Sequence, residues 1–371
     1  MAKFPHIQIQ SVSTDSMTVR YGLASYEKGV VLEATDGTHA FSTCTTEYNA
    51  TGRLRLDGLC PDTQYTLTVS LAGNILARLE ARTLPDWGEP LLHLAIVGDP
   101  HLVLDRPNRN GRLHEESRAL LKETFDDIEQ QGCSLVMMAG DLTDAGLDTE
   151  LDAAEIVLSR YSGRILMVPG NHDAVEGRIL RWKARGFPTT FEEQLNGIQL
   201  VGLDTGLGCL STPENIRIVQ SVDPSQPVIM VSHYQIFPDN TIADSDRAVC
   251  DANPQDDMVE KIASWKGMAY IGHKNIPAMV AMNSMLHVNI PQPLHYPAGW
   301  LEACVFPHGI RHVFHPIFSE ALHEYSRLGC ARATSKIGLT MDQVREANAP
   351  ALWNMAYDWE KRQLFTACKI Q

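Results

Sequence analysis

A short apolar run, Arg164 to Val168, ends in the sequence Pro169-Gly170-Asn171-His172-Asp173. Four other strand-like runs between Leu91 and His273 end similarly, in the stretches Gly98-Asp99-Pro100-His101, Gly140-Asp141, Ser232-His233 and Gly272-His273. Helix-like segments separate several of these runs, so the region predicts an α/β layered domain with buried strands. Because ligands of open α/β sheets bind outside the carboxyl ends of the strands, the five loops should deliver their polar side chains to one rim.

These loops carry a set of side chains that suits a metal centre: Asp99, His101, Asp141, Asn171, His233 and His273. Hard oxygen donors mixed with imidazoles suit Mn, Fe(II) or Zn. The glycines that precede four of the loop motifs are expected to let the backbone turn tightly beside the ions. Taken alone, each aspartate would more often cap a helix, and His233 would more often be a core histidine. Their joint occurrence at successive strand ends favours ligation.

The calcineurin-like metallophosphoesterases have a signature that this chain resembles in the series Asp99-x-His101, Gly140-Asp141, Gly170-Asn171-His172-Asp173, Ser232-His233 and Gly272-His273. The resemblance covers about half of the chain, from Leu91 to His273. It implies a four-layer αββα sandwich that binds two divalent ions, of Mn, Fe or Zn. The implied activity is hydrolysis of a phosphomonoester or phosphodiester by a metal-bridging hydroxide.

The resemblance also implies a role for each matching residue. Asp99 and His101 would hold the first metal, and Asp141 would bridge both ions. The second metal would be held by Asn171, His233 and His273. By the same analogy, His172 is not a ligand but contacts the phosphoryl group and assists the leaving group, with Asp173 orienting its ring. General acid catalysis by an imidazole fits that role.

The last motif departs from the usual family pattern Gly-His-x-His, because this chain has Gly272-His273-Lys274-Asn275. Asn275 stands where the first metal normally gains a histidine. An amide oxygen is a weaker donor than imidazole, so we expect a weaker first site or a preference for Mn over Zn. The alternative is a catalytically impaired metallophosphoesterase-fold scaffold that acts as a protein-binding module. Lys274 either contacts a phosphate oxygen or faces solvent.

Further residues near the motifs leave alternatives open. Asn108, Arg109 and Arg112 follow the first motif and either touch substrate or belong to an exposed loop. His295 lies in a proline-rich loop and is one candidate to replace the missing ligand. Purple acid phosphatases also place a fibronectin-like domain before a phosphoesterase domain. Their pattern has a tyrosine three residues after the bridging aspartate, where this chain has Asp144, so we do not expect an Fe(III)-tyrosinate enzyme.

The N-terminal region has a different pattern. From Ile7 to Thr83 apolar and polar residues alternate with period two, which predicts a small β-sandwich. The stretch Leu56 to Tyr65 resembles the corner of fibronectin type III-like domains, in which the tyrosine hydroxyl ties the corner together. We therefore predict three parts: a fibronectin type III-like domain at 1–85, a metallophosphoesterase domain at 86–330, and a helical tail at 331–371 that packs on the catalytic domain.

The amino-acid composition limits the classes of binding partner that we expect. The 371 residues carry a formal net charge of −14, with no basic excess to favour nucleic acid or anionic membranes. A phosphoester substrate stays compatible, because bound cations can reverse the field inside one pocket. The eight cysteines include no C-x-x-C pair, so a zinc ribbon is not expected. No signal peptide or membrane-length apolar run is visible, and a cytoplasmic location is the expectation.

Overall fold

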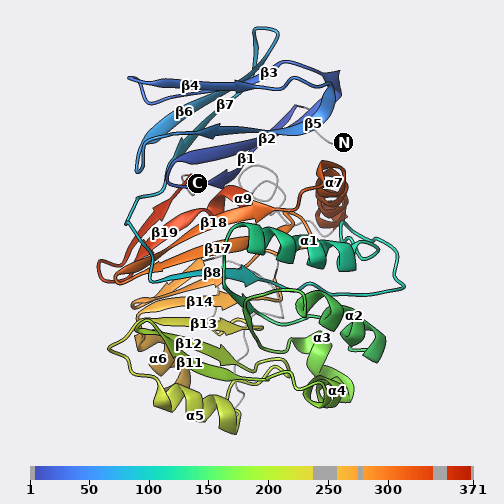
Figure 1. Cartoon of the computed structure of the whole chain (residues 1–371), viewed down its shortest axis with the longest axis vertical. Helices are drawn as coiled ribbons and strands as arrows, with labels where there is room; N and C mark the ends of the chain where they lie inside the picture. Colours follow the sequence, from blue (N-terminus) through green and yellow to red (C-terminus); the bar gives the residue numbers. More distant parts are fainter. Residues whose placement is uncertain (1–4, 237–256, 275–278, 337–348, 369–371) are drawn as a thin grey trace.

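The computed structural model describes residues 5–236, 257–274, 279–336 and 349–368. Its N-terminal region consists of two antiparallel sheets, drawn in blue in Figure 1. The first sheet has the order β1-β2-β5, with bounds His6–Val12, Ser16–Glu27 and Asn49–Asp57. The second has the order β4-β3-β6-β7, with bounds Ala40–Cys44, Val30–Thr35, Gln64–Leu71 and Asn74–Arg82. Alternate side chains of both sheets, among them Val19, Leu32 and Val69, form a common core.

A seven-stranded sheet follows, with the order β10-β9-β8-β17-β18-β19-β20. The bounds of these strands, in that order, are Arg164–Met167, Leu135–Met138, Leu92–Val97, Gly299–Phe306, Gly309–Pro316, Met355–Asp358 and Gln363–Thr366. The first three strands are parallel, and β17 pairs with β8 in antiparallel fashion.

A six-stranded sheet faces it, with the order β11-β12-β13-β14-β16-β15. The bounds, in that order, are Phe191–Leu195, Ile198–Leu203, Val228–Ser232, Gly267–Ile271, Met285–Asn289 and Met279–Met282. The inner faces of the two sheets share one core, to which β8 contributes Ile96 and β13 contributes Ile229. Because side chains alternate along a strand, the next residues of β8, Ala95 and Val97, point to the outer face.

Helices cover both outer faces. On the seven-stranded sheet these are α1 and α2, and on the six-stranded sheet α5 and α6, with bounds Ser117–Gln130, Asp148–Leu158, Pro213–Ser221 and Asp257–Ser264. Short segments follow the third motif: α3, η1 and α4 at Asn171–Ala174, Val175–Gly177 and Arg178–Ala184. The predicted four-layer α/β domain after an all-β region is therefore confirmed. Among the described residues, no helix has both the length and the apolar character that crossing a membrane requires.

β17 and β18 complete the seven-stranded sheet beside β8. One detail differs from the sequence prediction. The tail is helical only in α7 (Glu320–Lys336) and α9 (Ala349–Leu352) within the described residues. Beyond α9 the chain forms the β19–β20 hairpin, because Met355 and Tyr357 fill the core that β18 leaves open at its edge.

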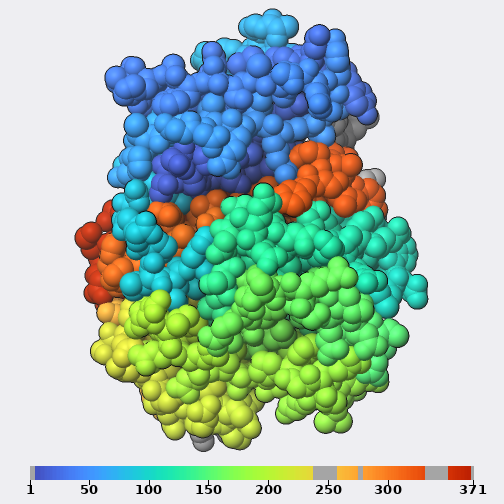
Figure 2. Space-filling model, viewed as in Figure 1, coloured from blue at the N-terminus to red at the C-terminus, as the bar shows by residue number. Residues whose placement is uncertain are grey.

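The N-terminal sheets pack directly on the β18 and α7 side of the α/β domain, as Figures 1 and 2 show. The buried Arg20 forms ion pairs of 2.8 Å with both Glu320 and Glu324 of α7. The side chain of Gln8 donates to the hydroxyl of Tyr296 at 2.7 Å. The two regions are thus joined by buried polar contacts close to the loops that precede α7.

Candidate metal centre

The loops after β8, β9, β10, β13 and β14 meet at one rim of the paired sheets. The glycines of these loops show how closely the loops pack, because a Cβ has no room at Gly98, Gly140, Gly170 or Gly272. A Cβ on Gly170 would lie 2.1 Å from Asp141 Oδ1, and one on Gly272 would lie 2.4 Å from Asp99 Oδ1. On Gly98 it would lie 2.4 Å from the carbonyl oxygen of Pro291. On Gly140 it would lie 2.6 Å from the backbone nitrogen of Gly170, and Gly140, with φ of +94°, is the one of these four glycines in the left-handed conformation.

Three groups of donor atoms form at this rim, and Asp141 belongs to two of them; the third consists of His101, Asp144 and His172. The donor atoms of Asp99, His101 and Asp141 all lie within 4.8 Å of one another, and so do those of Asp141, His233 and His273. His233 Nε2 is 3.3 Å from Asp141 Oδ2, and His101 Nε2 is 3.6 Å from the same oxygen. The structure therefore brings together the residues expected at two sites, with the bridging candidate between them.

Asn171 supplies a further oxygen to the second group. Its Oδ1 lies 2.9 Å from His233 Nε2 and 3.2 Å from His273 Nδ1. Of the seven predicted ligands, six are gathered here, whereas Asn275 lies outside the described residues. Lys274 is buried rather than facing solvent.

Most of the predicted ligands at this centre are buried, and their burial sets the electrostatics of the centre. Burial raises the pKa of Asp99 to about 7 and that of Asp141 to about 8. It lowers the pKa of His101 and of His273 to about 3. Among the residues that the structure describes, Asp99 Oδ1 has no hydrogen-bond partner although it is fully buried. Divalent cations would restore the charged carboxylates and use the lone pairs of the neutral imidazoles, so this donor set fits them.

The backbone at the ligands is strained. His101, Asp141 and His273 have φ values of 40°, 47° and 61°, in the left-handed region that residues with a Cβ rarely adopt. Each such residue costs on the order of 1–3 kcal/mol and persists only where the surroundings impose it. Strain at three predicted ligands and close packing at the adjacent glycines both indicate a site whose geometry is fixed before any ligand arrives.

Comparison with known families agrees with this geometry. The profile of the calcineurin-like phosphoesterase family matches residues 92–276. The chain contains a calcineurin-like phosphoesterase domain. No curated protein matches the chain.

One solved structure with a similar chain path is a dimetal phosphatase from Danio rerio, which is 13% identical in sequence. The match covers 62% of this chain and 98% of the phosphatase chain, with a TM-score of 0.47. Another is a purple acid phosphatase from seeds of yellow lupin (Lupinus luteus), which is 14% identical in sequence. That match covers 85% of this chain and 72% of the lupin chain, with a TM-score of 0.43.

In the phosphoesterase domain, His172 lies beside the donor groups. Its backbone N–H donates to Asp141 Oδ1 at 2.8 Å, and its ring Nδ1 is 2.5 Å from the backbone carbonyl oxygen of Asp144. A carbonyl oxygen can only accept, so Nδ1 carries a proton and Nε2 is the ring nitrogen left for substrate. The side chain is 31% exposed, which makes it more accessible than His101 or His233.

Asp173 does not have the position that a ring-orienting carboxylate would need. Its oxygens accept hydrogen bonds from the backbone N–H groups of Leu142, Thr143 and Gly170, and from the hydroxyl of Thr143. The carboxylate therefore ties the second motif loop to the third. The ring of His172 is oriented instead by the main chain at Asp144, which sequence reasoning considered only as the place of a missing tyrosine.

Other residues of the site were missed by sequence reasoning. The carboxylate of Asp144 lies 3.4 Å from His101 Nδ1 and 3.7 Å from His172 Nδ1, and it pairs with Arg106. Gln292 Nε2 donates to Asp99 Oδ2 at 2.6 Å from the proline-rich loop, 193 positions away in sequence. Asp144 could have been found from its spacing after Asp141, whereas no local signal marks Gln292.

The structure also places residues whose roles the sequence left undecided. His295 forms an isolated β-bridge with Arg112, so the proline-rich loop contacts the loop after the first motif. The guanidinium of Arg112 acts on the pKa of Asp99, His101 and Asp141 alike, which places its charge close to the centre. Arg112 is half-buried, whereas Arg109 is exposed.

Proposed function

We propose that the chain is a metal-dependent hydrolase of phosphomonoesters or phosphodiesters. The observation that carries this proposal is the buried carboxylate of Asp141, which belongs to two of the donor groups at the rim. Asp99, His101 and Asp141 would hold a first divalent ion, with Asn275 as a further candidate ligand. A second ion would be held by Asp141, Asn171, His233 and His273. When bound, such a pair activates water and neutralises charge on the phosphoryl oxygens.

His172 is proposed as the general acid. Its Nδ1–H is held by the carbonyl oxygen of Asp144, so its Nε2 can carry the proton that the leaving oxygen needs. The carboxylate of Asp144 lies 3.7 Å from the same Nδ1. Asp173 then acts by holding the loops of Asp141 and His172 together. This is a positioning role in place of the expected contact with the ring.

Arg112 is proposed to bind the substrate. Its backbone is fixed by a hydrogen bond of 2.9 Å from its N–H to the carbonyl oxygen of Arg109, and by the bridge to His295. A half-buried guanidinium beside a metal centre can contact phosphoryl oxygens in bidentate fashion, which a lysine cannot do. The carboxylate-rich first site favours Mn or Fe(II), and Zn is the third candidate.

The proposal is tested with chelator-stripped, full-length protein that is reloaded with Mn²⁺. We expect hydrolysis of p-nitrophenyl phosphate or bis-p-nitrophenyl phosphate, and the ratio of the two rates distinguishes monoesterase from diesterase activity. Asp141→Asn should abolish turnover. Asp126→Asn, the same change on the exposed face of α1, is the matched control and should keep it. Metal-loaded protein with no turnover on either compound would favour the scaffold alternative.

For the N-terminal region we propose a fibronectin type III-like sandwich over residues 1–85. The proposal is supported by the sheet orders β1-β2-β5 and β4-β3-β6-β7. The hydroxyl of Tyr65 accepts a hydrogen bond of 2.9 Å from the N–H of Cys60, as the expected corner requires. Residues 86–330 would form the catalytic domain, and the tail from 331 to 371 would complete it through the β19–β20 hairpin.

A further inference from the structure

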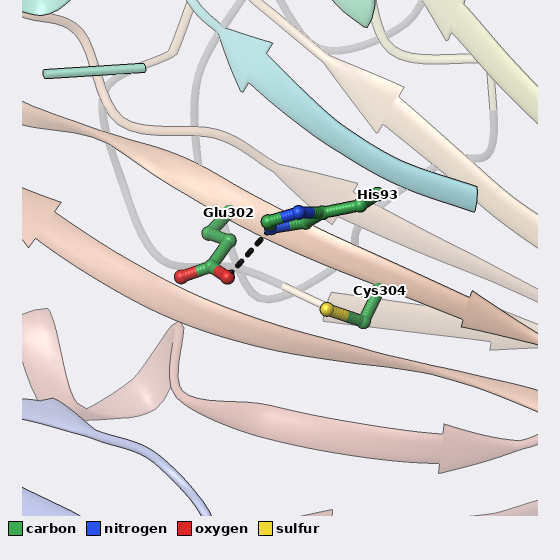
Figure 3. A group of neighbouring side chains, drawn as sticks. All are labelled: His93, Glu302 and Cys304. Atoms are coloured by element: carbon green, nitrogen blue, oxygen red, sulfur yellow. Dashed lines mark hydrogen bonds and ion pairs between the residues drawn. The ribbon is translucent and has the colours of Figure 1, made fainter. Parts of the chain in front are cut away.

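A second group of metal-binding side chains lies at the opposite end of the seven-stranded sheet from the catalytic rim. His93 stands near the start of β8, and Cys304 of β17 is its direct partner in the antiparallel register. Glu302 precedes Cys304 by two residues, so it points to the same face of the sheet. Figure 3 shows these three side chains gathered on that face.

The donor atoms of His93, Glu302 and Cys304 all lie within 4.8 Å of one another. His93 Nε2 is 2.8 Å from Glu302 Oε1. A second thiol approaches the same imidazole nitrogen, because Cys133 Sγ lies 3.6 Å from His93 Nε2. His93, Glu302 and Cys304 therefore form one compact group, and Cys133, in the loop that precedes β9, approaches this group from the side of the His93 ring.

The carboxylate of Glu302 is held in place from its other side. His315 Nε2 contacts Glu302 Oε2 at 2.8 Å. The ring of His315 stacks on Trp300 with ring centroids 4.5 Å apart, and its Nδ1 faces Asp127 at 3.8 Å. Trp300 in turn donates to Asp127 at 2.8 Å. Outer hydrogen-bond partners of this kind orient a carboxylate that binds a metal. Because His315 holds Oε2 of Glu302, the other carboxylate oxygen, Oε1, faces His93.

We propose that His93, Glu302 and Cys304, completed by Cys133, form a structural site for a thiophilic divalent cation such as Zn²⁺, separate from the catalytic centre. The set has the mixed nitrogen, oxygen and sulfur donors that zinc accepts in tetrahedral sites. Within the described part of the chain, the donor groups of the catalytic centre contain nitrogen and oxygen atoms alone. The two sites should therefore select different metals, with the softer ion at the thiolates.

The spacing of the donors agrees with a tetrahedral ion. Zn–N of about 2.0–2.1 Å and Zn–S of about 2.3 Å set a nitrogen and a sulfur ligand roughly 3.6 Å apart, and Cys133 Sγ lies 3.6 Å from His93 Nε2. The hydrogen bond from His93 to Glu302 would have to open by about half an ångström, because nitrogen and oxygen ligands of zinc are about 3.3 Å apart. The partly exposed side chains of His93 and Glu302 give the ion a path of entry.

The surrounding charges also suit a cation. Two thiolates and the carboxylate of Glu302 would more than balance a divalent ion, and the guanidinium of Arg311 interacts with Cys304 from outside the group. Without a cation the thiols are protonated, since burial raises the pKa of Cys304 to about 11 and raises that of Cys133 further. Metal uptake would then release protons and weaken as the pH falls.

Cobalt is the probe that separates this site from the catalytic one. The full-length protein is stripped with a chelator and titrated with Co²⁺, and the near-ultraviolet charge-transfer absorption of a cobalt thiolate is recorded. We expect the band in wild type, its displacement by one equivalent of Zn²⁺, and its loss in the Cys133→Ser, Cys304→Ser double variant. Glu302→Gln keeps both thiols and should weaken Co²⁺ binding by tenfold or more.

Two controls make the outcome specific. Cys44→Ser removes an exposed thiol of β4 and should leave the band unchanged. Asp141→Asn should also keep the band, because it alters only the catalytic centre. The proposal is overturned if saturating Co²⁺ gives no thiolate band in wild type, or if the double variant keeps the band at wild-type intensity.

Discussion

Asp141→Asn is expected to stabilise the metal-free protein while it destroys the catalytic centre. The carboxylate is buried, and its removal from solvent is the largest cause that raises its pKa from 3.8 to about 8. Asparagine has nearly the same shape and keeps an oxygen that can accept the 2.8 Å hydrogen bond from the N–H of His172. The variant therefore removes the charge with little change in packing.

The sign and size follow from the two pKa values. Because the folded-state pKa lies above the unfolded one, the wild-type carboxyl contributes its full stability below about pH 4 and loses it as the pH rises toward 8. Each pKa unit corresponds to about 1.4 kcal/mol, so a shift of about four units sets an upper limit near 6 kcal/mol. We expect a difference of about 3–6 kcal/mol in favour of Asp141→Asn at pH 8, and almost none at pH 4.

The assay is unfolding by denaturant in the presence of a chelator, at several pH values between 4 and 8, for wild type and Asp141→Asn. Comparison of the two proteins cancels the opposite contributions of buried histidines such as His101 and His273. Mn²⁺ should narrow the difference, since it stabilises only the protein that binds it, by about 2.7 kcal/mol at a hundredfold excess over Kd. Equal stability of the two chelated proteins across the whole pH range would refute the burial of an uncompensated charge at Asp141.

Three further predictions follow from the same geometry. Gly170→Ala places a methyl group 2.1 Å from Asp141 Oδ1 and should weaken Mn²⁺ binding more than tenfold in a titration; unchanged affinity would contradict the close packing at this loop. His172→Asn should lower kcat by about 10²–10⁴-fold with Mn²⁺ content unchanged, and a smaller loss for a substrate with a better leaving group would support the general-acid role. Arg112→Gln should raise KM about tenfold or more, whereas the exposed Arg109→Gln should not; equal effects of the two changes would exclude a specific contact.

Much of the site could be predicted from the sequence because each loop that carries predicted ligands follows a strand. A strand end is a local feature, and parallel strands bring their carboxyl ends to one rim whatever the details of packing. The pattern could not show why the glycines are there. At Gly170 and Gly272 the reason is contact with a carboxylate of another loop, which depends on how the loops meet.

The features that were missed depend on distant pairing. Gln292 reaches Asp99 only because β17 lies beside β8 and brings the proline-rich loop to the rim. The tail was expected to be helical, but its apolar residues are compatible with either a helix or an edge hairpin. The hairpin forms because the free edge of β18 pairs with β19. His93 and Cys304 likewise meet through the register of two strands that are remote in sequence.

The most direct test is an anomalous-difference map from crystals grown with Mn²⁺. The account predicts two peaks, one on each side of the Asp141 carboxylate, the first also contacting Asp99 and His101 and the second contacting His233 and His273. A map with no Mn²⁺ within bonding distance of Asp141, or with a single ion that does not contact it, would contradict the shared carboxylate on which the hydrolase proposal rests.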